Sequence, residues 1–232
     1  MKKALLTTFL FFALVAIAVQ AQDNKKEKDK QQFKTRIDLF TDVWQDVPDA
    51  FNGKSLNRGI NIYSMYERPV KNTCISFLAG VGIGSHNVYL DNALTKNDEG
   101  SIIFSAIPDT LSNGTNVNTK RSKISVTYID IPVEFKIQNE KNIRAALGFK
   151  LGYLINSLSK YKGDNYMEDS SSDVIVKKKG IDGINSLRYG PTIRFGYKWI
   201  DVSAYYSLSS LFEDNKGPEM YPISIGISIN KF

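Results

Sequence analysis

The segment Tyr128–Ile137 reads YIDIPVEFKI and decides the fold, because its residues alternate in character with a period of two. Isoleucine, valine and phenylalanine occupy the odd positions from 129 to 137, and the even positions between them carry Asp130, Pro132, Glu134 and Lys136. Successive side chains of a β-strand point to opposite faces. The segment is therefore predicted to form a strand with one apolar and one mainly charged face.

The same alternation returns along the chain and predicts seven further strands. Five patterns are clear, over residues 73–85, 143–155, 187–197, 200–208 and 223–229, and two weaker ones cover residues 34–41 and 58–68. A strand that crosses a bilayer in a tilted barrel needs roughly 9–11 residues, whereas strands of soluble domains commonly have about five to six. The lengths favour strands that cross a membrane, and the weak pattern at 34–41 leaves open whether that segment is the first barrel strand.

The connections between the predicted strands alternate between long and short. The long ones cover residues 42–57, 90–122, 159–184 and 210–221, and the short ones cover residues 69–72, 138–142 and 198–199. Outer-membrane barrels place short turns on the periplasmic side and long loops outside the cell. The fold class predicted for residues 34–232 is therefore all-β, an eight-stranded antiparallel transmembrane up-and-down β-barrel.

The first residues have the pattern of an export signal. Two lysines precede a mainly apolar stretch over residues 4–19, and the tripeptide VQA at 19–21 offers a cleavage site. A membrane-anchoring helix is the alternative, but the stretch is short for a span and a cleavage site follows it at once. We therefore predict a cleaved signal peptide over residues 1–21, a polar leader over residues 22–33, and the outer membrane of a Gram-negative bacterium as the location.

The polar faces of the predicted strands carry charges of both signs. They are Arg36, Asp38, Asp130, Glu134, Lys136, Arg144, Lys150, Arg188, Arg194 and Asp201. In a membrane barrel these faces line an interior that, with eight strands, is only wide enough for side chains to fill. We therefore expect a luminal charge network and no open pore. The candidate pairs are Glu134 with Arg144 or Lys150, and Asp130 with Arg188 or Arg194. In the alternative, a soluble sandwich or lipocalin-like barrel, the same charges would form the wet outer face.

Aromatic residues fall near both predicted ends of the strands, as in the aromatic belts of membrane proteins. Those at inner ends are Phe135, Tyr197, Trp199 and Phe232, and those at outer ends are Tyr89, Tyr153, Tyr189, Phe212 and Tyr221. Pro132 and Pro191 lie inside predicted strands, where proline removes a backbone donor. We expect bulges or local irregularity at both.

His86 is the only histidine of the chain and lies near the predicted outer rim. A general base needs a partner within hydrogen-bond distance. Ser85 would point to the opposite face, whereas Ser159, Ser207 or Asp91 could approach the imidazole. We expect a plain rim residue rather than a catalytic one.

The other candidate sites have simpler explanations. Four loop carboxylates could bind a divalent cation or lipopolysaccharide counter-ions, but they lack the spacing of a calcium loop, so a solvated acidic loop is expected. They are Asp164, Glu168, Asp169 and Asp173. The GVGIG run at 80–84 lies within a strand with no helix after it, which argues against a nucleotide-binding turn. Cys74 is the only cysteine and is expected to pack without a disulfide. No catalytic residue, cofactor or metal site is predicted.

Several segments resemble one protein family in their order along the chain. They are GINIYSMYERPV (59–70), FLAGVGIGSHNVY (77–89), KISVTYIDIPVEFKI (123–137), AALGFKLGYLINSLSKYK (145–162) and AYYSLSSLFEDNKGPEMYPISIGISI (204–229). Over residues 57–232 the chain resembles the PorT-like outer-membrane barrels of Bacteroidetes. This resemblance implies an outer-membrane β-barrel domain. PorT is associated with the type IX secretion system, many relatives have no assigned role, and the family offers no catalytic residues.

Three functions follow as hypotheses. The first is a barrel without catalytic activity that has a structural or interaction role, which the PorT-like resemblance links to protein secretion. The second is a narrow porin-type channel for small solutes, and the third is a lipid-modifying membrane enzyme that uses His86. The expected partners are outer-membrane lipid and lipopolysaccharide, together with secretion-system or envelope proteins. Nucleic acid is not expected, because the net charge of +6 comes from scattered residues of both signs.

Overall fold

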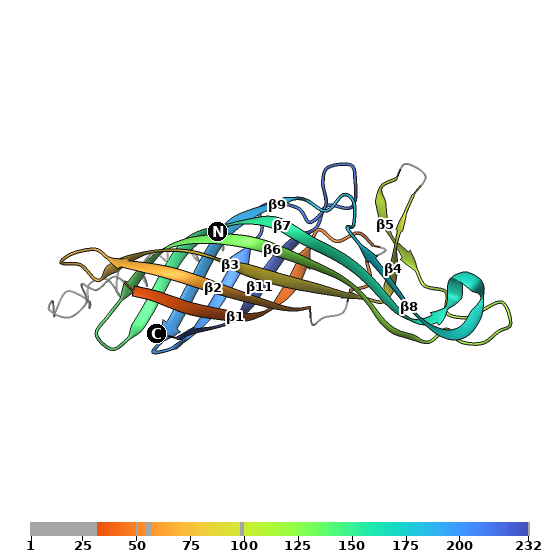
Figure 1. Ribbon diagram of the computed structural model, residues 1–232, viewed down its shortest axis with the longest axis horizontal. Helices are drawn as coiled ribbons and strands as arrows, with labels where there is room; N and C mark the ends of the chain where they lie inside the picture. The colour runs from red at the N-terminus through yellow and green to blue at the C-terminus, as the bar shows by residue number, and fades with distance from the viewer. Residues whose placement is uncertain (1–31, 50, 54–56, 98–99, 232) are drawn as a thin grey trace, which may run out of the picture.

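Eight strands pair edge to edge in a closed ring, so no strand of the ring has a free edge (Figure 1). The computed structural model describes residues 32–49, 51–53, 57–97 and 100–231. The ring strands are β1 (Gln32–Gln45), β2 (Arg58–Pro69), β3 (Ile75–Leu90), β6 (Thr119–Gln138), β7 (Ile143–Asn165), β9 (Leu187–Tyr197), β10 (Ile200–Tyr206) and β11 (Tyr221–Lys231). All neighbours in the ring are antiparallel, which confirms the predicted fold class. The predicted signal peptide and most of the predicted leader lie outside the described residues.

Strand β1 closes the ring between β2 and β11. Ile37 lies opposite Ile62 of β2 and Ile229 of β11. The weak pattern over residues 34–41 is therefore part of a full barrel strand, which begins at Gln32, just before its predicted start.

An apolar belt covers the outer surface of the ring. Large hydrophobic side chains are exposed there: Leu39, Ile62, Val81, Ile83, Ile131, Leu147, Phe149, Leu151, Val202, Ile225 and Ile227. Lipid offers the backbone no hydrogen-bond partners, so a sheet that spans it must close on itself. The closed ladder and the exposed belt together identify the surface that faces lipid.

Most of the predicted aromatic positions lie on the outer surface. Among the exposed ones, Phe135, Tyr197 and Trp199 lie near the inner turns, and Tyr153 and Tyr189 lie toward the outer end. The expectation for Phe212 is wrong, because its side chain is buried above the lumen rather than placed at the rim. Phe232 lies outside the described residues.

The predicted irregularity is present at Pro132 and absent at Pro191. Opposite Pro132, the pairing of β6 with β3 skips two pairs and resumes in the same register. Pro191 keeps its register with Phe149 of β7. The main bulge of the barrel lies elsewhere, where the β6–β7 register shifts between Thr127 and Tyr128.

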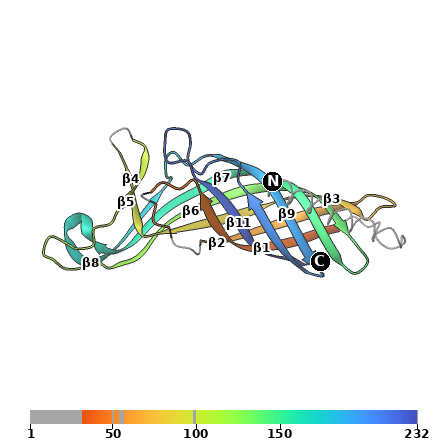
Figure 2. The same ribbon diagram turned by 180° about the vertical axis from the view of Figure 1, so that it is seen from behind.

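Beyond the ring, β6 and β7 continue into an extension at the outer end (Figures 1 and 2). These two strands have 20 and 23 residues, about twice the length that a tilted strand needs to cross a bilayer. The outer half of β7 pairs with β8 (Ser170–Lys179), and β4 (Asn92–Lys96) and β5 (Ile102–Ala106) form a separate hairpin. The long connections predicted as outer loops therefore contain strands of their own.

A single 3-10 turn, η1 (Tyr166–Glu168), is the helical element of the described residues. No helix in this part of the chain is long and apolar enough to span a membrane.

The polarity of β6 inverts between the ring and the extension. At Asp130 the charged side chain points inward and the neighbouring Ile129 is exposed on the outer surface. Farther out, Ile124 and Val126 are the buried inward residues, and the outward positions are polar. A bulge in the neighbouring strand, whose extra residue is Ile155 of β7, lies beside this change, between the pairs Thr127–Asn156 and Tyr128–Leu154. We place the outer edge of the apolar belt at this inversion.

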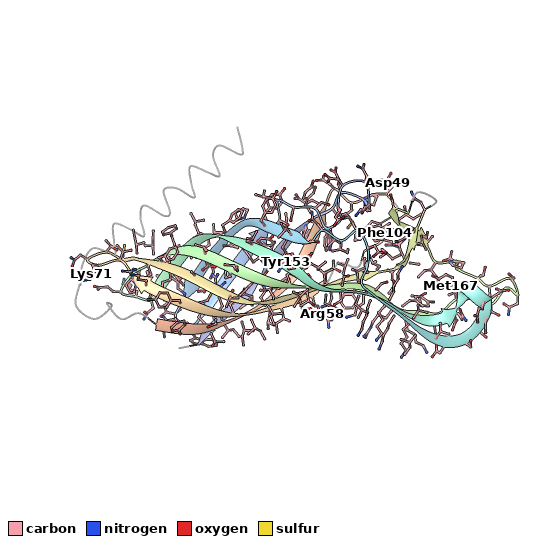
Figure 3. All side chains as sticks on the ribbon, turned by 45° about the horizontal axis from the view of Figure 1, so that its top comes forward. Asp49, Arg58, Lys71, Phe104, Tyr153 and Met167 are labelled. Atoms are coloured by element: carbon pink, nitrogen blue, oxygen red, sulfur yellow. The ribbon has the colours of Figure 1, made fainter. Side chains whose placement is uncertain are left out.

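The inward residues of the extension form a hydrophobic core, here called the outer cap, above the lumen. Its buried members are Val88, Leu90, Ile102, Phe104, Ile124, Val126, Tyr128, Ile181, Ile184, Leu211, Phe212 and Met220. They come from β3, β5, β6 and the segments on either side of β9 and β10. In Figure 3 the labelled Phe104 and Met167 lie at the extended end, and the labelled Lys71 lies at the opposite end, in an inner turn.

Gly84 provides a test of how tightly the lumen is packed. A Cβ at this position would lie 2.5 Å from Asn61 Oδ1, 2.6 Å from Asp130 Oδ2 and 2.7 Å from Arg188 Nη2. We expect Gly84→Val to destabilise the barrel by about 1–3 kcal/mol, as overpacking of a core does. The temperature at which the folded barrel loses its characteristic migration on SDS gels measures this change in stability. Ser85→Val, which adds a valine on the outer face, is the matched control, and equal behaviour of the two variants would contradict the packing described.

Candidate functional site

Nine of the ten charges predicted to line the lumen are buried, and Arg144 is half-buried. They gather in two layers inside the ring. The inner layer lies toward the short turns and is centred on Glu134 and Asp201. The outer layer lies below the outer cap and is centred on Asp130.

Glu134 is the acceptor at the centre of the inner layer. Arg36 Nη1 donates to its two carboxylate oxygens at 3.0 and 3.1 Å, and Arg194 Nη2 donates to Oε1. Asp38 adds a second acid, 3.5 Å from Arg36 Nε. The interaction joins β1, β6 and β9 across the lumen.

The partners predicted for Glu134 were wrong, and the strand register explains why. Glu134 lies opposite Gly148 of β7, so Arg144 is four residues farther along that strand, about 13 Å away at ~3.3 Å per residue. Lys150 is nearer, but its ammonium lies 3.7 Å from the ring centroid of Tyr205. The partners of Glu134 thus come from strands that are not its neighbours, because inward side chains can reach across a narrow barrel.

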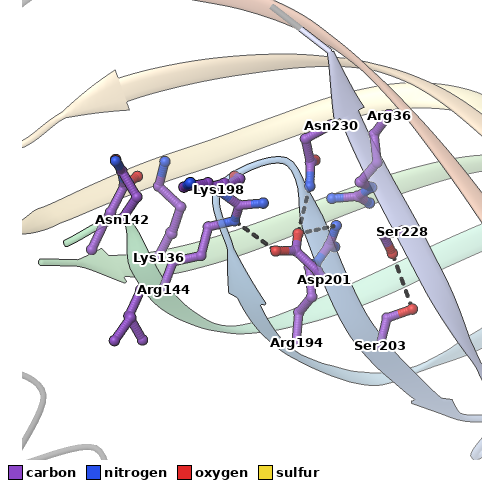
Figure 4. A network of polar contacts seen from close by, with 12 residues as sticks. Arg36, Lys136, Asn142, Arg144, Arg194, Lys198, Asp201, Ser203, Ser228 and Asn230 are labelled. Atoms are coloured by element: carbon purple, nitrogen blue, oxygen red, sulfur yellow. Dashed lines mark hydrogen bonds and ion pairs between the residues drawn. The ribbon is translucent and has the colours of Figure 1, made fainter.

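Asp201 is the second acceptor of the inner layer (Figure 4). Arg144 Nε donates to Oδ1 at 2.6 Å and Asn230 Nδ2 donates to Oδ2 at 2.5 Å. Arg194 Nη1 lies 4.0 Å from the same carboxylate and so links Asp201 to Glu134. Ser228 donates to Ser203 at 3.0 Å beside this group.

The inner layer borders a cavity of about 280 Å³ at the end of the ring that carries the short turns. Glu67 lies on its wall, 3.1 Å from Lys34 Nζ and in contact with Lys136 Nζ. The two smaller cavities deeper in the lumen measure about 30 and 20 Å³. Since one water needs roughly 10–15 Å³ on this measure, each has room for only one to three waters.

Asp130 anchors the outer layer. Arg188 donates from Nη2 to Oδ2 at 2.6 Å and from Nε to Oδ1 at 3.2 Å, which is one of the two pairings expected for Asp130. Tyr63 donates its hydroxyl to the same carboxylate at 3.0 Å. The Arg188 guanidinium also stacks 4.1 Å from the ring centroid of Tyr128.

His86 lies in this outer layer rather than at an open rim. Its Nδ1 is 2.7 Å from Asp42 Oδ2, and Ser224 donates to the other oxygen of Asp42 at 2.5 Å. Nε2 contacts Arg188 Nη1. A guanidinium only donates, so Nε2 is the acceptor and the proton sits on Nδ1.

This arrangement engages both ring nitrogens of His86. A general base must offer a free nitrogen to the substrate or nucleophile. Of the serines considered beside His86, Ser207 lines the same 20 Å³ cavity, but its hydroxyl donates to the Ser209 carbonyl oxygen at 2.9 Å. The geometry is that of a structural hydrogen-bond chain.

Three of the four loop carboxylates, Glu168, Asp169 and Asp173, are exposed, as expected of a solvated acidic loop, whereas Asp164 is buried. Each of the four has a hydrogen-bond or ion-pair partner within the extension. Asp164 accepts from the backbone of Asn118 at 2.8 Å, and Asp169 accepts from that of Ser112 at 2.7 Å. The other two are engaged by side chains: Glu168 by Asn165 and Asp173 by Lys120.

The prediction missed Asp42, Glu67, Tyr63 and Tyr205, which complete the two layers. Asp42 is in phase with Arg36 and Asp38, so extending the first strand beyond residue 41 would have included it. In β2 the sequence left the apolar face ambiguous. The structure turns Tyr63 inward and leaves Ile62 exposed.

The family to which most of the chain matches agrees with this architecture. Residues 37–213 match the family described as "Outer membrane protein beta-barrel domain". No curated protein matches the chain. The chain is similar to Ail of Yersinia pestis, solved in complex with the heparin analogue sucrose octasulfate, at 11% identity and a TM-score of 0.39 over 87% of this chain and 99% of Ail. It is also similar to a mutant of Rh. blastica porin, at 8% identity and a TM-score of 0.22 over 87% of this chain and 100% of the porin.

Glu134 offers the sharpest test of the charge network. We expect Glu134→Gln to destabilise the barrel by about 3–5 kcal/mol, because it leaves the buried charges of Arg36 and Arg194 without their shared acceptor. Urea unfolding in detergent micelles, followed by tryptophan fluorescence, measures the change. Glu140→Gln, in an exposed inner turn, is the control. A loss below about 1 kcal/mol for Glu134→Gln would mean that the network is not stabilising.

Proposed function

The chain belongs to the outer-membrane β-barrel domain family, and we propose that it is a closed, non-catalytic barrel that presents its extension outside the cell as an interaction platform. It is an outer-membrane β-barrel protein. The ring anchors the protein in the membrane, and the extension makes contact with partners.

The observation that carries the proposal is the double obstruction of the lumen. Arg36, Glu134 and Arg194 bridge three strands across the ring, and the outer layer around Asp130 follows. Above both lies the outer cap, which is apolar and buried. A solute would have to break buried ion pairs and then cross a hydrophobic core.

A narrow channel is the second candidate, favoured by the cavity of about 280 Å³ at the inner end. That cavity ends at the inner layer, beyond which the named cavities shrink to about 30 and 20 Å³. A hydrated ion needs several waters around it, so these volumes support a closed lumen.

The absence of catalysis is part of the proposal and is supported by His86. Both of its ring nitrogens are engaged, by Asp42 and Arg188. This leaves it without the free nitrogen that a lipid-modifying reaction would require.

The proposed partners are lipid along the belt and envelope proteins at the extension. The PorT-like resemblance adds secretion machinery as one class of protein partner. The extension offers such a partner exposed apolar side chains, among them Met167 at 68% and Ile175 at 56% exposure. Exposed apolar residues of this size are typical of interaction sites when they cluster.

Conductance in planar bilayers tests the closed lumen. We expect no steady single-channel current from the wild-type barrel. We also expect none from R36S/E134S/R194S, because the outer layer around Asp130 and the outer cap still close the lumen when the Glu134 cluster is removed. The control is the wild-type porin of a characterised bacterium inserted in the same bilayer. Steady ohmic currents from the wild-type barrel would favour the channel and contradict the proposal.

A further inference from the structure

Three neighbouring strands of the extension place lysines directly opposite one another. Lys123 of β6 lies opposite Lys160 of β7, which lies opposite Lys177 of β8. The rows on either side add Arg121 opposite Lys162, and Lys179 opposite Leu158. We call these six cations the lysine ladder.

The ladder lies on one face of the sheet, because residues paired across antiparallel strands share a face. The opposite face carries Ser159, Tyr161 and Val176, which line a groove against the β4–β5 hairpin. The ladder therefore points away from the outer cap. In Figure 3 a row of nitrogen-tipped side chains projects from the narrow part of the extension, on the side of the labelled Arg58.

The cations of the ladder have little to neutralise them within the described chain. Lys123 Nζ donates to Asn87 Oδ1 at 2.7 Å and lies 5.8 Å from the ring centroid of Tyr89. Among the described residues, no carboxylate lies within 4.0 Å of any ladder cation. Burial lowers the pKa of Lys123, and the charges of Arg121 and Lys160 lower it further. Like charges directly opposite one another destabilise a sheet. An anion bound from outside the chain would relieve this repulsion.

The position of the ladder identifies the anion. It continues the outer face of β6 and β7 beyond Ile129 and Ile155, the last exposed isoleucines of the belt on these strands. Lys160 is five residues beyond Ile155, about 17 Å along the strand and roughly 12 Å along the membrane normal at a tilt of ~45°. Lysine side chains bend toward an interface over several ångströms, which brings their ammonium groups to the headgroup layer.

We propose that the lysine ladder, formed by Arg121, Lys123, Lys160, Lys162, Lys177 and Lys179, binds the phosphate groups of an outer-leaflet lipid, as in a phosphorylated lipid A. The acyl chains of that lipid lie against the belt below. The inference names the site for the lipid contact proposed above. It rests on the outer-membrane placement and is independent of whether the lumen conducts.

Native mass spectrometry of the full barrel in a zwitterionic detergent tests the site with diphosphorylated lipid A as the probe. We expect K123Q/K160Q/K177Q to lower the affinity at least tenfold. The control K71Q/K141Q/K178Q removes the same charge from two inner turns and from the opposite face of β8, and should stay within twofold of wild type. Equal losses in both variants, or none in the first, would overturn the proposal.

Two further probes separate the lipid from other anions. Lipid A without its phosphates should bind the wild-type barrel weakly. Its affinity should not exceed that of diphosphorylated lipid A for K123Q/K160Q/K177Q. Inorganic phosphate that bound as tightly as lipid A would show a free-anion site and overturn the lipid assignment. The barrel should also lose lipid A as salt rises, because screening weakens exposed charge pairs.

A stability measurement tests the ladder without any ligand. In zwitterionic detergent at low ionic strength, Lys160→Gln relieves repulsion from both Lys123 and Lys177 and should raise the unfolding midpoint of the empty barrel. Lys178→Gln, on the opposite face, should leave it unchanged. A midpoint that fell with Lys160→Gln would contradict the ladder, whatever the conductance result.

Discussion

The hydrocarbon core of a membrane offers no hydrogen bonds, and this absence shapes the rest of the molecule. The backbone satisfies its hydrogen bonds because eight strands close into a ring through the β1–β11 pairing. The side chains separate by polarity, with isoleucines on the outer surface and charged residues in the lumen. Once the charges are inside so narrow a ring, they must neutralise one another, since a buried ion without a partner is very costly. Glu134, Asp201 and Asp130 provide that neutralisation for four arginines. The charge-filled lumen is thus a consequence of placing a polar face inside eight strands.

Outside the hydrocarbon core, water can hydrogen-bond to the backbone, and the two faces of the strands exchange their polarity. Beyond Ile129 the strands turn apolar residues inward and polar residues outward, as a soluble barrel does. The outer cap results, and it closes the lumen a second time with hydrophobic contacts instead of ion pairs. The lysine ladder belongs to the same reversal, because it occupies the outer face at the first rows beyond the belt. One inversion of polarity therefore explains the cap, the ladder and the membrane boundary together.

The period-two patterns predicted the ring well, because in lipid one face of each strand must be apolar throughout. Tyr128–Ile137, Ile143–Ile155 and Leu187–Tyr197 each lie within an observed strand. The individual ion pairs could not be predicted in the same way: strand neighbours are readable from sequence, but Arg36 reaches Glu134 across the lumen. The extension was missed although its signal was present. In KISVTY (123–128) the apolar residues change phase relative to Ile129, and a change of phase, unlike a loss of pattern, indicates a strand that leaves the membrane.

A scan of nitroxide spin labels along the outward positions of β6 tests the central claim most directly. Labels would be placed singly at positions 121 to 137, every second residue, in a Cys74→Ser background reconstituted in bilayers. Accessibility to oxygen and to a water-soluble nickel complex then reports depth. We predict lipid exposure at Ile129, Ile131 and Phe135, and water or headgroup exposure at Arg121, Lys123 and Ser125. Lipid exposure that continued to Lys123, or water exposure at Ile131, would contradict the inversion as the membrane boundary.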